Sequence, residues 1–162
     1  VYSYGLKNLP VLDIFIIAIG FVLRVFAGAV AISVPVSNWM FLTTFSLALY
    51  LGSVKRREEL SRSGSNARGV LSKYSVSLVD RYATTSANAS ILFYSVFVIT
   101  SKPDLVLTVP LVIFGIFRFW FAAESRDQGE SPTEVLLKDW QLQIGVLLWS
   151  SLSFWILATG GE

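Results

Sequence analysis

The chain has 162 residues, of which 54% are hydrophobic and 15% are charged, and its formal net charge is +2. Globular domains carry about 25% charged residues, so this composition, with its apolar residues gathered in long runs, indicates an integral membrane protein without a nucleic-acid partner. The sequence contains no Cys and no His, which excludes disulfides, thiolate metal sites and histidine-based acid–base catalysis and leaves oxygen ligands and a hard ion such as Mg²⁺ for any metal chemistry.

Five apolar runs are each long enough to cross a bilayer as a helix of about 17–25 residues. The predicted spans are residues 10–33, 38–54, 82–100, 105–123 and 141–159. The second is short, and the third carries several Ser, Thr and Asn side chains, which a helix tolerates where it faces a partner helix or a wet cavity. The sequence therefore predicts an all-α, polytopic transmembrane helical bundle, with residues 1–162 forming a single domain.

The first span contains two charged residues, Asp13 and Arg24. They are eleven residues apart, about three helical turns, so both project from nearly the same face. Arg24 lies near the expected bilayer midplane, where a charge is costly and therefore informative. Two interpretations remain: Arg24 is hydrogen-bonded to carbonyl groups of neighbouring helices, or it lines a polar cavity together with Asp13. We favour the cavity.

The loop at residues 55–81 holds seven of the thirteen Lys and Arg residues. Cytoplasmic loops carry an excess of basic residues, so we expect this loop, residues 124–140 and residues 1–9 on the cytoplasmic side of a multi-pass plasma-membrane protein. We assign Arg57, Arg62 and Lys73 to this topological role.

Lys55, Arg56 and Glu59 follow directly after the second span and form a candidate site for an anionic ligand. Lys55 and Glu59 share a helical face by their i, i+4 spacing. Arg68 and Tyr74 are further candidates for donating hydrogen bonds to a phosphate group. The alternative is that these basic residues, too, only orient the chain in the membrane.

The last long loop contains Ser131-Pro132-Thr133-Glu134, which combines an N-cap serine, a proline at the first helical position and a glutamate three residues after the cap. This pattern predicts a short helix over residues 132–139. The helix is either a connector leading back into the last span or an active-site lid. Arg118, close to the end of the fourth span, is explained equally well by snorkelling to the interface and by ligand binding.

Four segments in order, YSYGLKNLPVLD, FVLRVFAGAVAI, KRREEL and SPTEVLLKD, resemble the UbiA superfamily of intramembrane prenyltransferases across nearly the whole chain. Members have nine transmembrane helices around a lipid-open cavity, and the five spans resemble the last five. KRREEL stands where ordinary members carry a second aspartate-rich motif. This departure resembles the phosphoribosyltransferase branch and counts against an aromatic prenyltransferase.

The resemblance implies an enzyme that transfers 5-phosphoribose from phosphoribosyl pyrophosphate to a polyprenyl phosphate, releasing pyrophosphate, for cell-wall arabinose precursors. Mg²⁺ is the implied cofactor, and membrane lipid and a second copy of the chain are possible partners. The alternatives are another UbiA-type prenyltransferase, for quinone or lipid synthesis, and a non-enzymatic transport or scaffold module. The resemblance also implies two sets of site residues. The catalytic residues are Lys55 and Glu59, and the substrate-binding residues are Tyr4, Lys7, Arg24, Arg56, Arg68 and Tyr74.

In the superfamily, the first aspartate-rich motif holds the Mg²⁺. No such motif occurs in this sequence, and we expect it upstream of Val1. The resemblance therefore names no metal ligand here and implies that this chain by itself is inactive.

Overall fold

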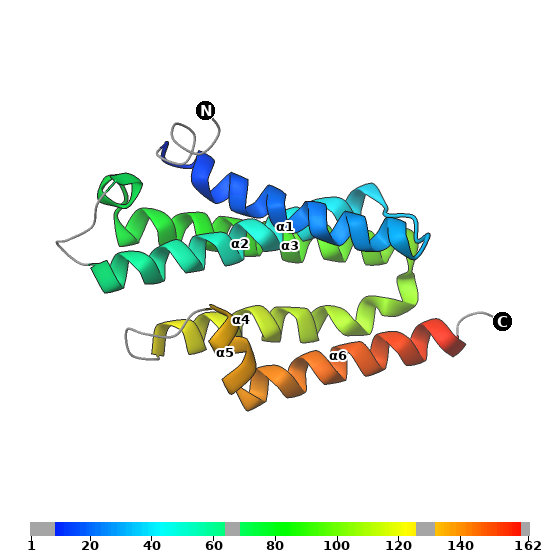
Figure 1. Ribbon diagram of the computed structural model, residues 1–162. Coiled ribbons are helices and arrows are strands. Elements are labelled where there is room, and N and C mark those ends of the chain that lie inside the picture. Colours follow the sequence, from blue (N-terminus) through cyan, green and yellow to red (C-terminus); the bar gives the residue numbers. More distant parts are fainter. Residues whose placement is uncertain (1–8, 64–68, 126–131, 160–162) are drawn as a thin grey trace. The chain divides into compact units, whose positions relative to one another are not determined.

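The computed structural model describes residues 9–63, 69–125 and 132–159, and its regular elements are all helices (Figure 1). The α-helices are α1 (Leu12–Ala31), α2 (Asn38–Ser63), α3 (Val76–Ser101), α4 (Val109–Ser125), α5 (Pro132–Lys138) and α6 (Trp140–Thr159). Two 3₁₀ helices, η3 (Gly69–Lys73) and η4 (Pro103–Thr108), precede α3 and α4. The predicted all-α class is confirmed.

Within the described ranges, four segments are long and apolar enough to cross a membrane: Leu12–Ala31, Val76–Ser101, Pro103–Ser125 and Trp140–Thr159. They coincide with the first, third, fourth and fifth predicted spans, which confirms a polytopic helical architecture. Helix α2 covers the second predicted span and continues to Ser63. Helix α2 is less apolar than the four candidate membrane-spanning segments, so its crossing of the membrane stays a prediction.

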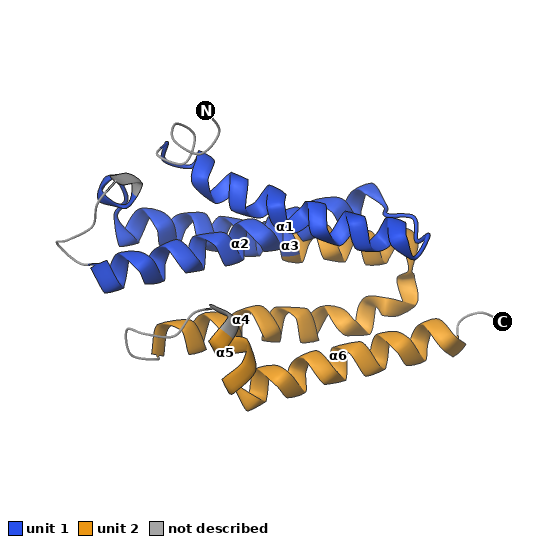
Figure 2. Cartoon of the chain, in the orientation of Figure 1, with its two compact units in different colours: residues 1–90 blue, residues 91–162 orange. Residues whose placement is uncertain are grey.

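The chain divides into two compact units, residues 1–90 and residues 91–162, and α3 contributes to both (Figure 2). In the first unit, α1 packs against α2. Among its described residues, Ile14, Leu60, Tyr74 and Val79 form one cluster of buried side chains, and Ala18, Val22 and Ala48 form another. Tyr74 of the first cluster also hydrogen-bonds to Asp13.

In the second unit, α4 packs against α6, and α5 contacts both helices. A chain of hydrogen bonds crosses its core. Trp149 Nε1 donates to the Tyr94 hydroxyl at 3.0 Å, and this hydroxyl lies 2.7 Å from Thr108 Oγ1. Thr108 donates its own hydroxyl proton to the Leu105 carbonyl at 2.6 Å, so Tyr94 is the donor to Thr108. Every buried hydroxyl in this chain of bonds therefore has a partner, as a low-dielectric interior requires.

The predicted short helix over residues 132–139 is confirmed by α5, which runs from Pro132 to Lys138. Asp139 separates α5 from α6. Only part of α5 packs inward, because Val135 is buried while Leu137 is 70% exposed.

Candidate anion-binding site at the end of helix α2

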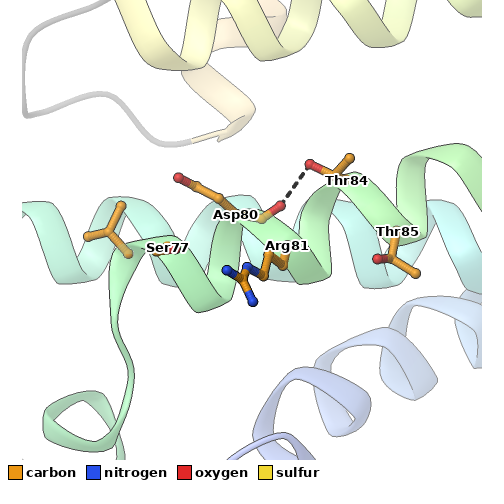
Figure 3. A pocket seen from close by; sticks show the side chains of 6 residues that line it. Ser77, Asp80, Arg81, Thr84 and Thr85 are labelled. Carbon is orange, nitrogen blue, oxygen red and sulfur yellow. Dashed lines mark hydrogen bonds between the residues drawn. The ribbon is translucent and has the colours of Figure 1, made fainter.

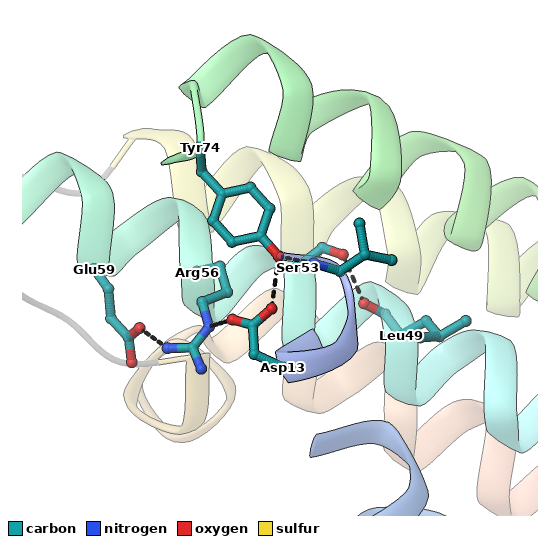
Figure 4. Close-up of polar contacts among 7 residues, drawn as sticks. Asp13, Leu49, Ser53, Arg56, Glu59 and Tyr74 are labelled. Carbon is teal, nitrogen blue, oxygen red and sulfur yellow. Dashed lines mark hydrogen bonds and ion pairs between the residues drawn. The ribbon is translucent and has the colours of Figure 1, made fainter. Parts of the chain in front are cut away.

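The candidate site forms where α2, the start of α1 and the residue after η3 come together. Helix α2 continues past the predicted span, so Arg56 and Glu59 lie one turn apart on it. Asp13 is in the first turn of α1, where a carboxylate interacts favourably with the helix dipole. Tyr74 follows η3 directly. Figure 4 shows the Asp13 carboxylate between the side chains of Arg56 and Tyr74.

Asp13 is the buried centre of this network, with its side chain only 1% exposed. Arg56 Nε donates to Asp13 Oδ2 at 2.7 Å, and the Tyr74 hydroxyl donates to Asp13 Oδ1 at 2.6 Å. A buried carboxylate is tolerated only when it is paired with a charge and hydrogen-bonded. Both of its oxygens meet this condition here.

The Tyr74 hydroxyl also accepts a hydrogen bond from the backbone N–H of Val11 at 2.5 Å. Val11 has φ 72°, in the left-handed region that β-branched residues rarely adopt. Such a conformation costs about 1–3 kcal/mol and persists only where surrounding contacts hold it. Tyr74 is therefore one of the contacts that fix the backbone just before α1.

Burial, followed by the hydrogen bond to Asp13, raises the pKa of Tyr74 to about 12. Both causes favour the neutral phenol. Near neutral pH the hydroxyl thus keeps its proton and serves as the donor to Asp13.

Arg56 holds a second carboxylate on its other edge. Its Nη1 donates to a carboxylate oxygen of Glu59, three residues further along α2. The Arg56 side chain is 13% exposed and that of Glu59 is 33% exposed. The Nη2 group of Arg56 has no hydrogen-bond partner within the described ranges. The guanidinium thus joins a buried carboxylate to a partly exposed one and keeps donors available.

The structure brings together three of the residues predicted from the sequence: Arg56, Glu59 and Tyr74. Lys55 is exposed at the neighbouring position of α2, and Glu59 pairs with Arg56 rather than with Lys55. The predicted residues Tyr4, Lys7 and Arg68 lie outside the described residues.

Arg24 and Asp13 do not share the environment expected from their common helical face. Asp13 is buried in the network with Arg56, whereas Arg24 is exposed further along α1. Arg24 has no ion-pair partner in the described part of the chain. Among the described residues, Asp13 is thus enclosed by its own ion pair, and the cavity shared with Arg24 stays a prediction.

Asp13 was singled out by its position in an apolar span, but its partner was not foreseen. Arg56 is 43 positions away in the sequence, and only the packing of α1 on α2 brings the two together. Other basic residues of the 55–81 segment are paired as well. Arg57 Nε donates to Asp80 at 2.7 Å, and Arg62 pairs with Glu58 at 2.5 Å.

An open hollow runs along one face of α3 (Figure 3). Its lining residues are Val76, Ser77, Asp80, Arg81, Thr84 and Thr85. The Asp80 carboxylate is occupied by Arg57, and its backbone carbonyl accepts a hydrogen bond from Thr84 at 2.9 Å. The hollow is lined by a single helix, so we place the candidate site at Arg56, where residues from three segments converge.

The described residues contain no group of three or more acidic side chains able to hold a metal ion. The carboxylates of Asp13 and Glu59 are both engaged by Arg56. The described ranges therefore contain no cluster of acidic ligands for the Mg²⁺ that the resemblance implies.

Three similar curated proteins carry the name decaprenyl-phosphate phosphoribosyltransferase. The protein from Mycolicibacterium smegmatis is 33% identical over 91% of this chain and 51% of its own length. The one from Corynebacterium glutamicum is 31% identical, with 91% and 47% covered, and the one from Mycobacterium tuberculosis is 29% identical, with 91% and 51% covered. The chain thus spans about half the length of the curated relatives it matches. No protein-family model matches it. The predicted resemblance to the phosphoribosyltransferase branch is confirmed by these names.

Proposed function

We propose that this chain contributes the last five helices of a UbiA-type decaprenyl-phosphate phosphoribosyltransferase. The proposed reaction transfers 5-phosphoribose from phosphoribosyl pyrophosphate to decaprenyl phosphate and releases pyrophosphate, for cell-wall arabinose precursors. The observation that carries the proposal is the similarity to proteins of that name, at 33% identity over 91% of the chain. The cationic end of α2 supports it, because both substrates carry phosphate groups.

The chemistry of this reaction fits a chain without histidine. In the transfer, the bond from the anomeric carbon to the pyrophosphate oxygen breaks, and a bond to an oxygen of the acceptor phosphate forms. A phosphate monoester has its second pKa near 6, so the acceptor needs no general base at neutral pH. The remaining demand is to orient the substrates and to stabilise negative charge on the leaving group.

We assign these tasks to the residues at the end of α2. Lys55 is exposed and offers a mobile point charge, and the guanidinium of Arg56 offers planar donors suited to phosphate oxygens. We assign Tyr74 to holding Asp13, in place of the phosphate contact expected from the sequence, because its hydroxyl proton is already donated to that carboxylate.

We also propose Tyr4, Lys7, Arg24 and Arg68 as substrate contacts. Glu59, paired with Arg56, is proposed as a catalytic-site residue.

Mg²⁺ is part of the proposal on the strength of the resemblance alone. When bound, it would neutralise the charge of the pyrophosphate leaving group. Chelation with EDTA is expected to abolish transfer, and added Mg²⁺ is expected to restore it. Full activity in EDTA would contradict this part of the proposal.

The membrane orientation can be tested directly because the chain has no Cys. We propose that α2 also crosses the plasma membrane and that residues 55–81 are cytoplasmic. A single cysteine at Lys73→Cys should react with an impermeant maleimide only after the membrane is opened. One at Val34→Cys, which is 51% exposed between α1 and α2, should react from outside. The opposite labelling pattern would reverse the orientation.

The function itself is tested by incubating the full-length protein in membranes with radiolabelled phosphoribosyl pyrophosphate and polyprenyl phosphate. We expect labelled lipid, with Lys55→Ala and Arg56→Ala each lowering the rate by at least about 100-fold, the size typical of lost transition-state charge stabilisation. Arg62→Gln, on the same helix and paired at the surface with Glu58, is the control and should retain activity. Transfer of a prenyl group instead of phosphoribose would identify another prenyltransferase, and the absence of both would contradict an enzymatic role.

A further inference from the structure

We propose that Glu59 occupies the ligand-binding edge of Arg56 and is displaced from it by a phosphate or pyrophosphate group, while Asp13 holds the other edge in place. The inference deepens the proposed function and rests on it for the class of ligand. It assigns two residues roles that concern Arg56 alone: Asp13 positions the guanidinium, and Glu59 is its exchangeable partner.

The two carboxylates on Arg56 differ strongly in their environments. The Asp13 side chain is 1% exposed and has a second hydrogen bond, from Tyr74. Glu59 is 33% exposed, and Arg56 is its hydrogen-bond partner in the described ranges. Breaking a buried, hydrogen-bonded pair is costly, whereas a partly exposed pair contributes little to stability. The pair with Glu59 is therefore the one that a ligand can replace.

The donor count of Arg56 favours a phosphate over Glu59. A guanidinium has five N–H donors, and in the described ranges Asp13 takes Nε and Glu59 takes one on Nη1. Glu59 thus makes a single contact and leaves Nη2 unused. A phosphate group has several oxygens and can bind Nη1 and Nη2 together, the bidentate arrangement that makes Arg–phosphate pairs strong.

The charges of the cluster also favour the exchange. Asp13 and Glu59 together balance Arg56 and Lys55, since Tyr74 is neutral. Moving Glu59 away from Arg56 removes a negative charge that would repel an incoming anion. Lys55 lies four residues before Glu59 on the same face of α2, is exposed, and has no ion-pair partner in the described ranges. Because Glu59 is 33% exposed, it can turn toward solvent when the anion binds, and Lys55 stays available to the phosphate group.

The test measures the affinity of the purified full-length protein for inorganic pyrophosphate by isothermal titration calorimetry in low-salt buffer with fixed Mg²⁺. Removing the competing charge by Glu59→Gln is expected to tighten binding about two- to fivefold, the range that a partly exposed ion pair represents. Glu58→Gln is the matched control, because Glu58 is the adjacent carboxylate on α2 and pairs with Arg62. Its affinity should stay within about twofold of the parent protein.

Arg56→Lys keeps the charge but lacks the planar donor pair that binds a phosphate through two hydrogen bonds, so we expect weaker binding than in the parent protein. Three outcomes would each overturn the exchange. They are unchanged or weaker binding in Glu59→Gln, parent-like binding in Arg56→Lys, and no pyrophosphate binding by the parent protein. The transfer assay separates this inference from the function. Labelled lipid without tighter binding in Glu59→Gln would overturn the exchange alone, and tighter binding without labelled lipid would overturn the proposed function alone.

Discussion

Arg118 binds Asp139 through two parallel hydrogen bonds, from Nε to Oδ1 at 3.0 Å and from Nη2 to Oδ2 at 2.8 Å. The Asp139 side chain is only 2% exposed. Its Oδ1 also accepts the backbone N–H of Leu142 at 2.9 Å, so the same carboxylate caps the start of α6. One side chain thus ties α4 to the junction of α5 and α6, and Arg118 has a specific carboxylate partner.

Removing this carboxylate should therefore destabilise the second unit. We expect Asp139→Ala to lower the free energy of unfolding by about 0.5–2 kcal/mol from the lost cap alone, with a further loss from the broken ion pair with Arg118. Asp139→Asn retains an acceptor for the Leu142 N–H and should cost less. Thermal unfolding of the purified protein in detergent measures both.

Glu58→Gln is the control for this comparison, since it breaks a more exposed ion pair with Arg62 and should cost at most about 1 kcal/mol. Equal melting temperatures for Asp139→Ala and Glu58→Gln would show that the Arg118–Asp139 pair contributes no more than a surface pair.

These two ion pairs illustrate what the sequence could and could not predict. Of the five apolar runs predicted as spans, four coincide with helices that are apolar enough to cross a membrane, and the pattern from Ser131 to Glu134 predicts α5, because both signals are local. The end of α2 is not predicted by the hydropathy pattern. A run of charges ends the predicted span at Val54 but not the helix, and the Glu58–Arg62 pair supports the helix as far as Ser63.

The candidate site could be predicted only in part, for the same reason. Arg56 and Glu59 were recognised from their place after a span and from a resembling motif. The role of Asp13 depends on contacts with Arg56 and Tyr74, 43 and 61 positions away. The residue pattern within one segment cannot predict such a contact, because the contact forms only when α1 packs against α2.

Tyr74 should make the protein sensitive to alkaline pH. Its pKa is raised from 10 to about 12, so the folded state holds the phenolic proton more tightly than the unfolded chain does. The resulting stability is fully present below pH 10 and is lost as the pH rises from 10 through 12. A pKa difference of one between the folded and unfolded states corresponds to about 1.4 kcal/mol, so the loss amounts to a few kcal/mol at most.

The measurement is the near-ultraviolet absorbance of tyrosinate, compared between the parent protein and Tyr74→Phe. The absorbance change that the parent protein shows and Tyr74→Phe lacks belongs to Tyr74, and we expect it above pH 11 in the folded protein. An absorbance change of Tyr74 near pH 10 would contradict its protection by burial and by Asp13.

Two glycines of the second unit should respond differently to alanine. A Cβ at Gly145 would lie 3.3 Å from Cδ1 of Phe114, whereas a Cβ at Gly115 meets no described atom within 4 Å. Alanine favours a helix over glycine by up to about 1 kcal/mol, and an added methyl in a filled space costs about 1–3 kcal/mol. We expect Gly115→Ala to be neutral or stabilising, and Gly145→Ala to be less stable than Gly115→Ala by up to about 1 kcal/mol, since Phe114 is 45% exposed and its ring can shift in part.

Urea or thermal unfolding of both variants in the same detergent provides the comparison. Phe114→Leu in the Gly145→Ala background should relieve the contact and recover part of the loss. Equal stabilities for the two alanine variants would show that the Phe114 ring moves aside without cost.

Substitution of Arg24 tests whether a charge inside the first span contributes to the proposed reaction. Arg24 lies twelve residues after the start of α1, about 18 Å along the helix, and a charge at a helix centre costs about 2.5–3.5 kcal/mol on insertion. Arg24→Leu should therefore insert at least as well as the parent protein. If Arg24 contacts a phosphate, the same variant should lower kcat/KM for phosphoribosyl transfer at least about tenfold, or about 1.4 kcal/mol, while Arg24→Lys retains part of the activity.

Leu23→Ala changes the neighbouring exposed side chain and is the control, expected to keep the parent rate. Parent-like transfer by Arg24→Leu at equal membrane abundance would limit Arg24 to a structural role.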